Sequence, residues 1–298
     1  MRFLDWRQSD NVINITSWFN NMKRISRLGL GGVGLLVALS VLAALAGLWK
    51  LLGISWVAFA AMAGAAPLGA RATQADADDG RRIVWGYGLA SGAMVTSAAV
   101  FLVPQAIAHD PTFGGFGVAL GLLAGFSAHT VGHQLTHREY PIDHTALELS
   151  AHALAAGTII GLVYAGMPEL GPLLGLAIVS HKGPAGYVAA RRLENEGKSA
   201  SVLLLPAAGV GVTAIPTGLL ALPGDPLVQA VVFGFASGVF LHVAMDFLPH
   251  CEFGSEISDR LGVSEGDHAL LDRLRTHAVA STSLGGLVVF VAWFVLAG

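Results

Sequence analysis

Long apolar stretches separated by short polar segments make up most of this chain. A helix needs about 20 apolar residues to cross a bilayer. Nine stretches meet or approach that length, at roughly 28–49, 54–71, 83–107, 114–136, 144–166, 170–190, 200–221, 226–249 and 274–297. The second is short and contains Pro67. The pattern predicts an all-α fold, a polytopic membrane helix bundle of about nine transmembrane helices.

The polar segments between these stretches are too short to form a separate soluble domain. We therefore expect one transmembrane helical domain over residues 28–298, preceded by a polar or amphipathic cytoplasmic arm over residues 1–27. The first apolar stretch begins too late and is too long for a cleavable signal peptide.

Composition narrows the class of protein further. Only 12% of the 298 residues are charged and 54% are hydrophobic, whereas soluble domains carry about 25% charged residues. This excludes an ordinary soluble enzyme. A net charge of −3 with no long basic block argues against a nucleic-acid partner. Cys251 is the single cysteine, which excludes a disulfide framework and a thiolate metal cluster.

The basic residues predict the orientation of the bundle. Of the seventeen Lys and Arg residues, fifteen fall on one side of the membrane when nine spans are counted. Lys50 falls on the other side, and Lys182 lies inside a span. The positive-inside rule then predicts an integral protein of the plasma (inner) membrane with a cytoplasmic N-terminus and an external C-terminus. The lipid bilayer is an expected partner, and we consider a homodimer as the form of self-association.

Ionisable residues inside the spans form three stripes. Such residues cost several kcal/mol in hydrocarbon, so they usually face the bundle interior or a hydrated path. Spacing of four residues places each set on one helix face. The stripes are His129, His133 and His137; His144, Glu148 and His152; and His242, Asp246 and His250. Under the predicted topology all three run from the membrane centre to the cytoplasmic edge.

Imidazoles beside carboxylates indicate a path for a metal ion or a proton. Together they are the ligand set that suits zinc and similar divalent transition-metal ions. His181 and Lys182 lie near the middle of the sixth span, at the same depth as the ends of the stripes that are nearest the membrane centre. The metal-binding residues that we predict are His152, His181, Asp246, Glu148, His242, His129, His133 and His250.

Two short motifs resemble those of the ZIP (Zrt/Irt-like) family of divalent-metal transporters. That family has an eight-helix core, with one extra N-terminal helix in some members, which matches nine spans. Its metal-site motifs are close to His-Asn-x-Pro-Glu-Gly and His/Gln-Asp/Asn-x-Pro-Glu-Gly. Residues 152–157, His-Ala-Leu-Ala-Ala-Gly, resemble the first motif, and residues 181–186, His-Lys-Gly-Pro-Ala-Gly, resemble the second. The resemblance implies that His152 and His181 are ligands, with Asp246 as a carboxylate partner.

The sequence departs from these motifs at several positions. Ala156 and Ala185 stand where the family has metal-bridging glutamates, and Ala153 replaces an asparagine. Lys182 stands where the family has Asp or Asn. Its ammonium either takes the place of a second metal ion or pairs with Asp246 or Glu148 to hold helices together. The departures imply a single-site transporter with altered selectivity or a relative that no longer transports.

The leading hypothesis is a transporter, not an enzyme, that moves a divalent transition metal toward the cytoplasm by alternating access. Zn²⁺ is the predicted ion. One alternative is a ZIP-like protein that has lost transport and acts as a metal-binding sensor or subunit. A second is a membrane di-iron enzyme with histidine boxes, since residues 129–133 fit HxxxH, although no HxxHH box exists.

Some apolar and small residues have a structural interpretation. We interpret Met94 as a core residue, although the ZIP family can place a soft ligand in that span. Glycine pairs predict close helix packing, and prolines predict kinks that free backbone carbonyls. The glycines are Gly121, Gly125, Gly157, Gly161, Gly209 and Gly211, and the prolines are Pro67, Pro104, Pro184, Pro216 and Pro249.

Overall fold

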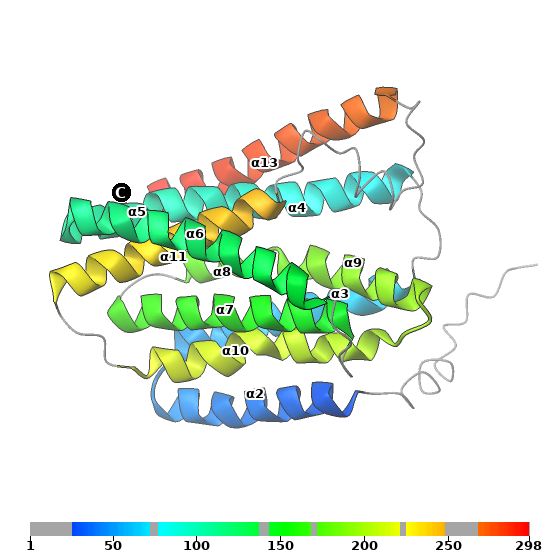
Figure 1. Cartoon of the computed structure of the whole chain (residues 1–298), viewed down its shortest axis with the longest axis horizontal. Helices are drawn as coiled ribbons and strands as arrows, with labels where there is room; N and C mark the ends of the chain where they lie inside the picture. The colour runs from blue at the N-terminus through cyan, green and yellow to red at the C-terminus, as the bar shows by residue number, and fades with distance from the viewer. Residues whose placement is uncertain are drawn as a thin grey trace, which may run out of the picture.

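The computed structural model is a bundle of helices that run along one common direction (Figure 1). It describes residues 26–71, 77–136, 143–167, 172–220, 225–247 and 268–297. The elements are α2 (Arg27–Leu45), α3 (Trp49–Arg71), α4 (Ala77–Ser97), η2 (Ala98–Leu102), α5 (Val103–His109), α6 (Pro111–Thr136), α7 (His144–Gly166), α8 (Leu173–Val179), α9 (Lys182–Asn195), η3 (Ala200–Leu203), α10 (Leu204–Gly218), α11 (Pro226–Phe247) and α13 (His268–Ala297). No strand occurs within these ranges.

Eight helical segments of the described residues are long and apolar enough to cross a membrane. They correspond to eight of the nine predicted stretches, so the predicted all-α membrane bundle is confirmed. The second stretch proves longer than the sequence suggested, because α3 begins at Trp49 and continues past Pro67 to Arg71. The chain is an integral membrane protein.

Short polar residues fix where several helices begin. Asp143 accepts a hydrogen bond from the backbone N–H of Ala146 at 3.1 Å and so caps α7. Asp110 and Asp225 accept from backbone N–H groups at the starts of α6 and α11. In both of these helices the aspartate is followed by a proline, which suits the first helical position because its missing N–H would have no partner there.

The sixth predicted stretch is two short helices instead of one. α8 ends at Val179, a turn covers Ser180 and His181, and α9 begins at Lys182. Pro184 explains the break, because proline inside a continuous helix lacks an N–H and clashes with the preceding turn. Pro104 has a smaller effect and follows the π-helical turn η2. Pro67 and Pro216 interrupt neither α3 nor α10, and Pro249 lies outside the described residues.

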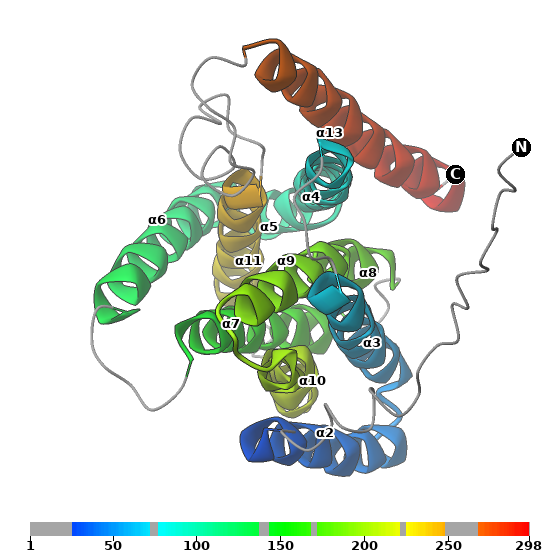
Figure 2. The same ribbon diagram turned by 90° about the vertical axis from the view of Figure 1, so that its right-hand side faces the viewer.

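The helices form two groups that meet at the centre of the molecule. The first group contains α2, α3, α7, α8, α9 and α10, and the second contains α4, η2, α5, α6, α11 and α13. Figure 2 shows the groups end-on, with α13, α4, α6 and α11 above and α7, α10, α3 and α2 below. Packing is extensive within each group, and the groups touch mainly where α4 and α11 approach α7, α8 and α9.

Glycine permits the close approach of helices within each group. Gly117 and Gly121 of α6 lie against α11, where Gly234 and Gly238 face them in return. The predicted glycine pairs are confirmed in the same way. Gly157 and Gly161 contact α10, Gly209 contacts Ala153, Gly211 contacts Leu36 and Ser55, Gly121 contacts Phe235, and Gly125 contacts His242. Such contacts let backbones pack closely where lipid supplies no hydrophobic driving force.

The substitution Gly69→Ala should destabilise the first group. A Cβ at Gly69 would overlap the backbone carbonyl of Tyr187 on α9, and such overpacking costs about 1–3 kcal/mol. The matched control is Gly64→Ala on the same helix, where a Cβ meets nothing within 4 Å. Thermal unfolding in detergent should show a lower midpoint for Gly69→Ala alone. Equal midpoints would contradict the close approach of α3 and α9.

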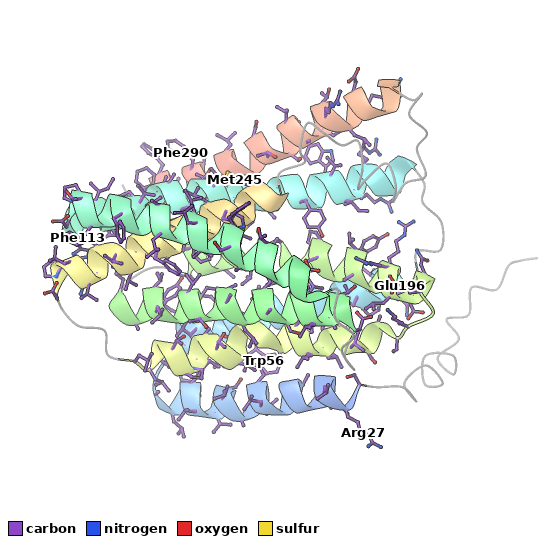
Figure 3. The ribbon with its side chains drawn as sticks, in the orientation of Figure 1. Arg27, Trp56, Phe113, Glu196, Met245 and Phe290 are labelled. Atoms are coloured by element: carbon purple, nitrogen blue, oxygen red, sulfur yellow. The ribbon has the colours of Figure 1, made fainter. Side chains whose placement is uncertain are left out.

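Most of the arginines and lysines at helix ends lie at one end of the bundle. Arg27 and Glu196 lie at this basic end, and Phe113 lies at the opposite end (Figure 3). The helix ends there carry Arg71, Arg81, Arg82, Arg191, Arg192, Lys198, Arg273 and Arg275. Between the ends, apolar side chains point outward, including Leu35 and Val41 of α2 and Phe290 and Val291 of α13. An apolar exterior of this kind suits contact with lipid tails.

Candidate functional site

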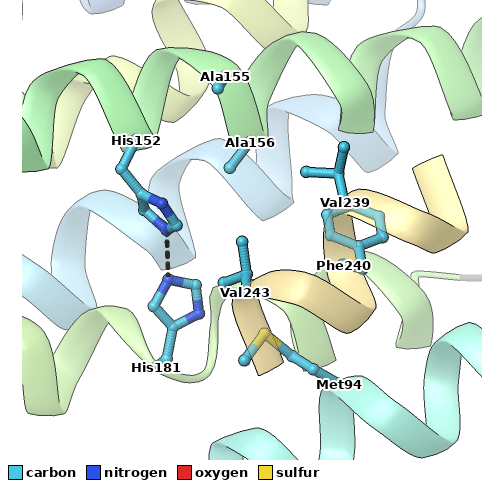
Figure 4. Close-up of a pocket in the computed structure, with 8 residues that line it drawn as sticks. All are labelled: Met94, His152, Ala155, Ala156, His181, Val239, Phe240 and Val243. Carbon is cyan, nitrogen blue, oxygen red and sulfur yellow. Dashed lines mark hydrogen bonds between the residues drawn. The ribbon is translucent and has the colours of Figure 1, made fainter. Parts of the chain in front are cut away.

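Two histidines meet where the two helix groups adjoin. His152, on α7, and His181, in the break between α8 and α9, approach with Nε2 to Nε2 at 3.3 Å. Their rings are edge-to-face, with centroids 5.4 Å apart. His181 is 1% exposed. Figure 4 shows both rings directed toward each other across the space between their backbones. The structure therefore brings together two of the residues that the sequence predicts as ligands.

The spacing of the two nitrogens suits a single metal ion. Tetrahedral zinc binds imidazole nitrogen at about 2.0–2.1 Å, which places two such nitrogens about 3.3–3.4 Å apart. A hydrogen bond at this distance needs one Nε2–H as donor and the other Nε2 as acceptor, and the tautomers decide which ring donates. An ion bound to both nitrogens would displace that proton and lie off the line that joins the two nitrogens, so both imidazole rings would have to turn toward it.

A small cavity opens beside the pair. Its volume is about 30 Å³, enough for an ion or one to two water molecules. The first group contributes His152, Ala155, Ala156 and His181, and the second contributes Met94, Val239, Phe240 and Val243. The cavity therefore lies on the boundary between the two groups. Met94, which we interpreted as a core residue, is fully buried and lines the cavity as well.

Lys182 lies next to the histidine pair and is 1% exposed. Its Nζ makes no hydrogen bond within the part of the chain that the structure describes. Lysine is almost never fully buried unless it is paired, which makes Lys182 a candidate functional residue. Ala185, also buried, supplies no carboxylate here.

The other predicted ligands take different positions. Glu148, one turn from His152 on α7, is exposed and does not line the cavity. His242 is half-buried on α11 and packs beside Gly125 of α6. The side chains of His129, His133 and Asp246, and all of His250, lie outside the described residues. Within the described residues, no group of three His, Cys, Asp or Glu side chains could hold a metal ion. Ligation by these residues therefore stays a prediction.

An apolar cluster fills the bundle between the histidine pair and the end that lies opposite the basic end. Both groups contribute to it, with Leu174 and Val163 from the first and Leu102, Phe233 and Phe240 from the second. The members named are at most 2% exposed. Access to the histidine pair from that end therefore requires the two groups to separate.

An ion-pair cluster joins two segments at the basic end. Lys198 Nζ lies 2.7 Å from Asp143 and 2.7 Å from Glu196. Partial burial raises the pKa of Asp143, but hydrogen bonds from Lys198 and Ala146 outweigh it and the net pKa is lowered. Hydrogen bonds from Lys198 and Arg192 lower the pKa of Glu196. The cluster ties the start of α7 to the turn after α9.

The substitution Lys198→Ala should give a small, pH-dependent loss of stability. A lowered pKa means that the pair stabilises the fold above the unfolded pKa of Asp, about 3.9, and that this contribution disappears as pH falls through the folded pKa. At pH 7 the unfolding midpoint should drop by no more than about 2 °C, and the difference should shrink as the pH falls below about 3.9. Arg275→Ala, which breaks the exposed Arg275–Asp272 pair, is the control. A difference that persists at low pH would contradict the ion-pair account.

Comparisons with known proteins add no family assignment. No family model matches this chain, and no curated protein matches its sequence. The functional argument therefore depends on the residues of the site and on the arrangement of the helices.

Proposed function

We propose that this protein is a membrane carrier that moves a transition-metal ion toward the cytoplasm by alternating access. The observation that carries the proposal is the 3.3 Å separation of the His152 and His181 Nε2 atoms at the boundary between two helix groups. Zn²⁺ is the ion that the sequence predicts, and the resemblance to the ZIP family supports the same class of cargo.

The site supports alternating access because its lining residues come from both helix groups. The two imidazoles belong to the first helix group, whereas Met94, Val239, Phe240 and Val243 belong to the second. A displacement of one group along the other would carry the ion while the glycine contacts inside each group stay intact. The apolar cluster covers the site from the opposite end, so ion entry and release occur in different arrangements of the groups.

Transport by the purified chain in liposomes tests this proposal. The full chain is reconstituted, and ion content is measured after external addition of Zn²⁺, Fe²⁺, Mn²⁺, Co²⁺, Ni²⁺, Cd²⁺, Cu⁺ or Ag⁺. The proposal predicts protein-dependent accumulation of at least one ion that saturates with concentration. Absence of accumulation for every ion would overturn it.

A ZIP-like protein without transport is the second candidate. The observation that favours it is the replacement of two glutamates by Ala156 and Ala185 together with the buried Lys182. A sensor or subunit would bind one ion tightly and show no flux in the same liposomes. Measuring binding and uptake on one preparation separates the two functions.

A further inference from the structure

The cavity offers a soft and uncharged set of donors. The Met94 thioether and the imidazoles of His152 and His181 are the donor-bearing side chains among the residues that line it. The remaining lining residues are alanines, valines and Phe240. Thioether sulfur with imidazole nitrogen is a donor set that favours Cu⁺ over the harder divalent ions.

The described wall of the cavity offers little to stabilise a doubly charged ion. Within the described residues, no carboxylate lines the cavity, and Ala156 occupies the wall beside His152. Lys182, which follows His181 in the sequence and is buried, brings no negative charge. The cost of removing an ion from water grows with the square of its charge, so a wall without carboxylates disfavours a dication more than a monocation.

From these donors, and from the lack of a carboxylate among the described lining residues, we infer that the site selects a singly charged soft cation, Cu⁺ or its redox-inert analogue Ag⁺, over Zn²⁺. The inference rests on the proposed carrier function and names the class of ion that this same site takes. It also assigns Met94 the role of a specificity-determining ligand from the second helix group. No oxidation or reduction of the ion takes part in the step.

Paired uptake measurements test the inference. Liposomes containing the full chain receive Ag⁺ or Zn²⁺ at equal free concentrations, and accumulated metal is measured. The inference predicts that the accumulated amount of Ag⁺ exceeds that of Zn²⁺ by about tenfold or more. Zn²⁺ uptake equal to or above Ag⁺ uptake would overturn the selectivity and leave the carrier function intact. Uptake of neither these ions nor the others of the panel would overturn the carrier function itself.

Two substitutions locate the selectivity at the cavity. Met94→Leu conserves volume and removes the sulfur, so Ag⁺ uptake should fall about tenfold while Zn²⁺ uptake changes less than about twofold. Ala156→Glu adds a carboxylate to the wall and should shift the preference toward Zn²⁺. If uptake of Ag⁺ and uptake of Zn²⁺ fall equally in Met94→Leu, Met94 has only a packing role, and its role as a ligand is overturned.

Metal binding to the purified protein tests the same ligands without depending on transport by the variants. Cu⁺ is bound to detergent-purified protein carrying Cys251→Ser, which removes the single cysteine as a competing sulfur ligand. X-ray absorption at the copper edge should show a sulfur neighbour with nitrogen neighbours, and Met94→Leu should lose the sulfur. If copper bound to the protein that retains Met94 has only nitrogen and oxygen neighbours, the assignment of Met94 as a ligand is contradicted.

Discussion

The double substitution His152→Ala plus His181→Ala should reduce metal uptake to the level of empty liposomes. It removes both nitrogens of the 3.3 Å pair and leaves Met94 as the one donor from the described cavity wall. Changes to outer-shell partners of a metal already cost about 10–100-fold in affinity, so removal of a direct ligand should cost at least about 100-fold in each single variant. Initial uptake rates over a range of ion concentrations measure the loss.

A histidine outside the cavity provides the control for this result. His277, on α13, accepts a hydrogen bond from Trp85 Nε1 at 3.2 Å and does not line the cavity. His277→Ala should keep uptake within about twofold of wild type. Unfolding midpoints in detergent establish that all variants are folded. If the double variant is folded and still transports at the wild-type rate, the histidine pair is not the binding site.

A reversible cross-link between the two helix groups should stop transport. A Cβ built at Gly86 of α4 lies 3.3 Å from Pro184 Cβ of α9, close to the 3.5–4.5 Å typical of disulfides. Cysteines at both positions, in a Cys251→Ser background, should form a disulfide on oxidation that fixes the second group to the first. Uptake should fall at least about tenfold after oxidation and return after reduction.

A cross-link inside the first group is the matched control. A Cβ at Gly32 of α2 lies 3.7 Å from Ala208 Cβ of α10, and both helices belong to that group. The pair Gly32→Cys plus Ala208→Cys should leave uptake unchanged when oxidised. Mass spectrometry measures the extent of cross-linking in both proteins. Full cross-linking of the Gly86–Pro184 pair with undiminished uptake would contradict movement between the groups.

The sequence predicted most of the spans because lipid imposes a length and an apolar composition on every crossing helix. The sixth stretch passed the same test of hydropathy, yet Pro184 divides it into α8 and α9. An average over the whole stretch hides that break, because the apolar α8 offsets the more polar α9. The break places His181 between the two helices, opposite His152.

The family resemblance of two motifs predicted the histidine pair but not its surroundings. The stripe on α7 placed Glu148 on the same face as His152, and the structure places Glu148 at the exterior and His152 beside the cavity. A stripe shows which residues share one face of a helix, but it does not show which neighbouring helix packs against each part of that face. The sequence favoured a core role for Met94, because methionine in an apolar span is indistinguishable from core packing, although the ZIP resemblance allows a soft ligand in that span. The division into two groups likewise depends on pairings between distant helices that no local pattern encodes.

The orientation of the bundle stays a prediction from the positive-inside rule. The structure adds that the charged helix ends collect at one end of the bundle, which is the end we expect in the cytoplasm. The ionic pairs of Lys198 also lie there. Labelling of an engineered terminal cysteine in intact cells, in the Cys251→Ser background, would establish the side of each terminus.

A structure of the metal-bound protein tests the central claim most directly. Crystals grown with Ag⁺ and with Zn²⁺ in turn would be measured at wavelengths where each ion scatters anomalously. The account predicts one anomalous peak per chain within bonding distance of both the His152 and the His181 Nε2 atoms, with Met94 sulfur as a further ligand for Ag⁺. Peaks confined to other positions, with the 3.3 Å hydrogen bond between the two rings intact, would contradict it.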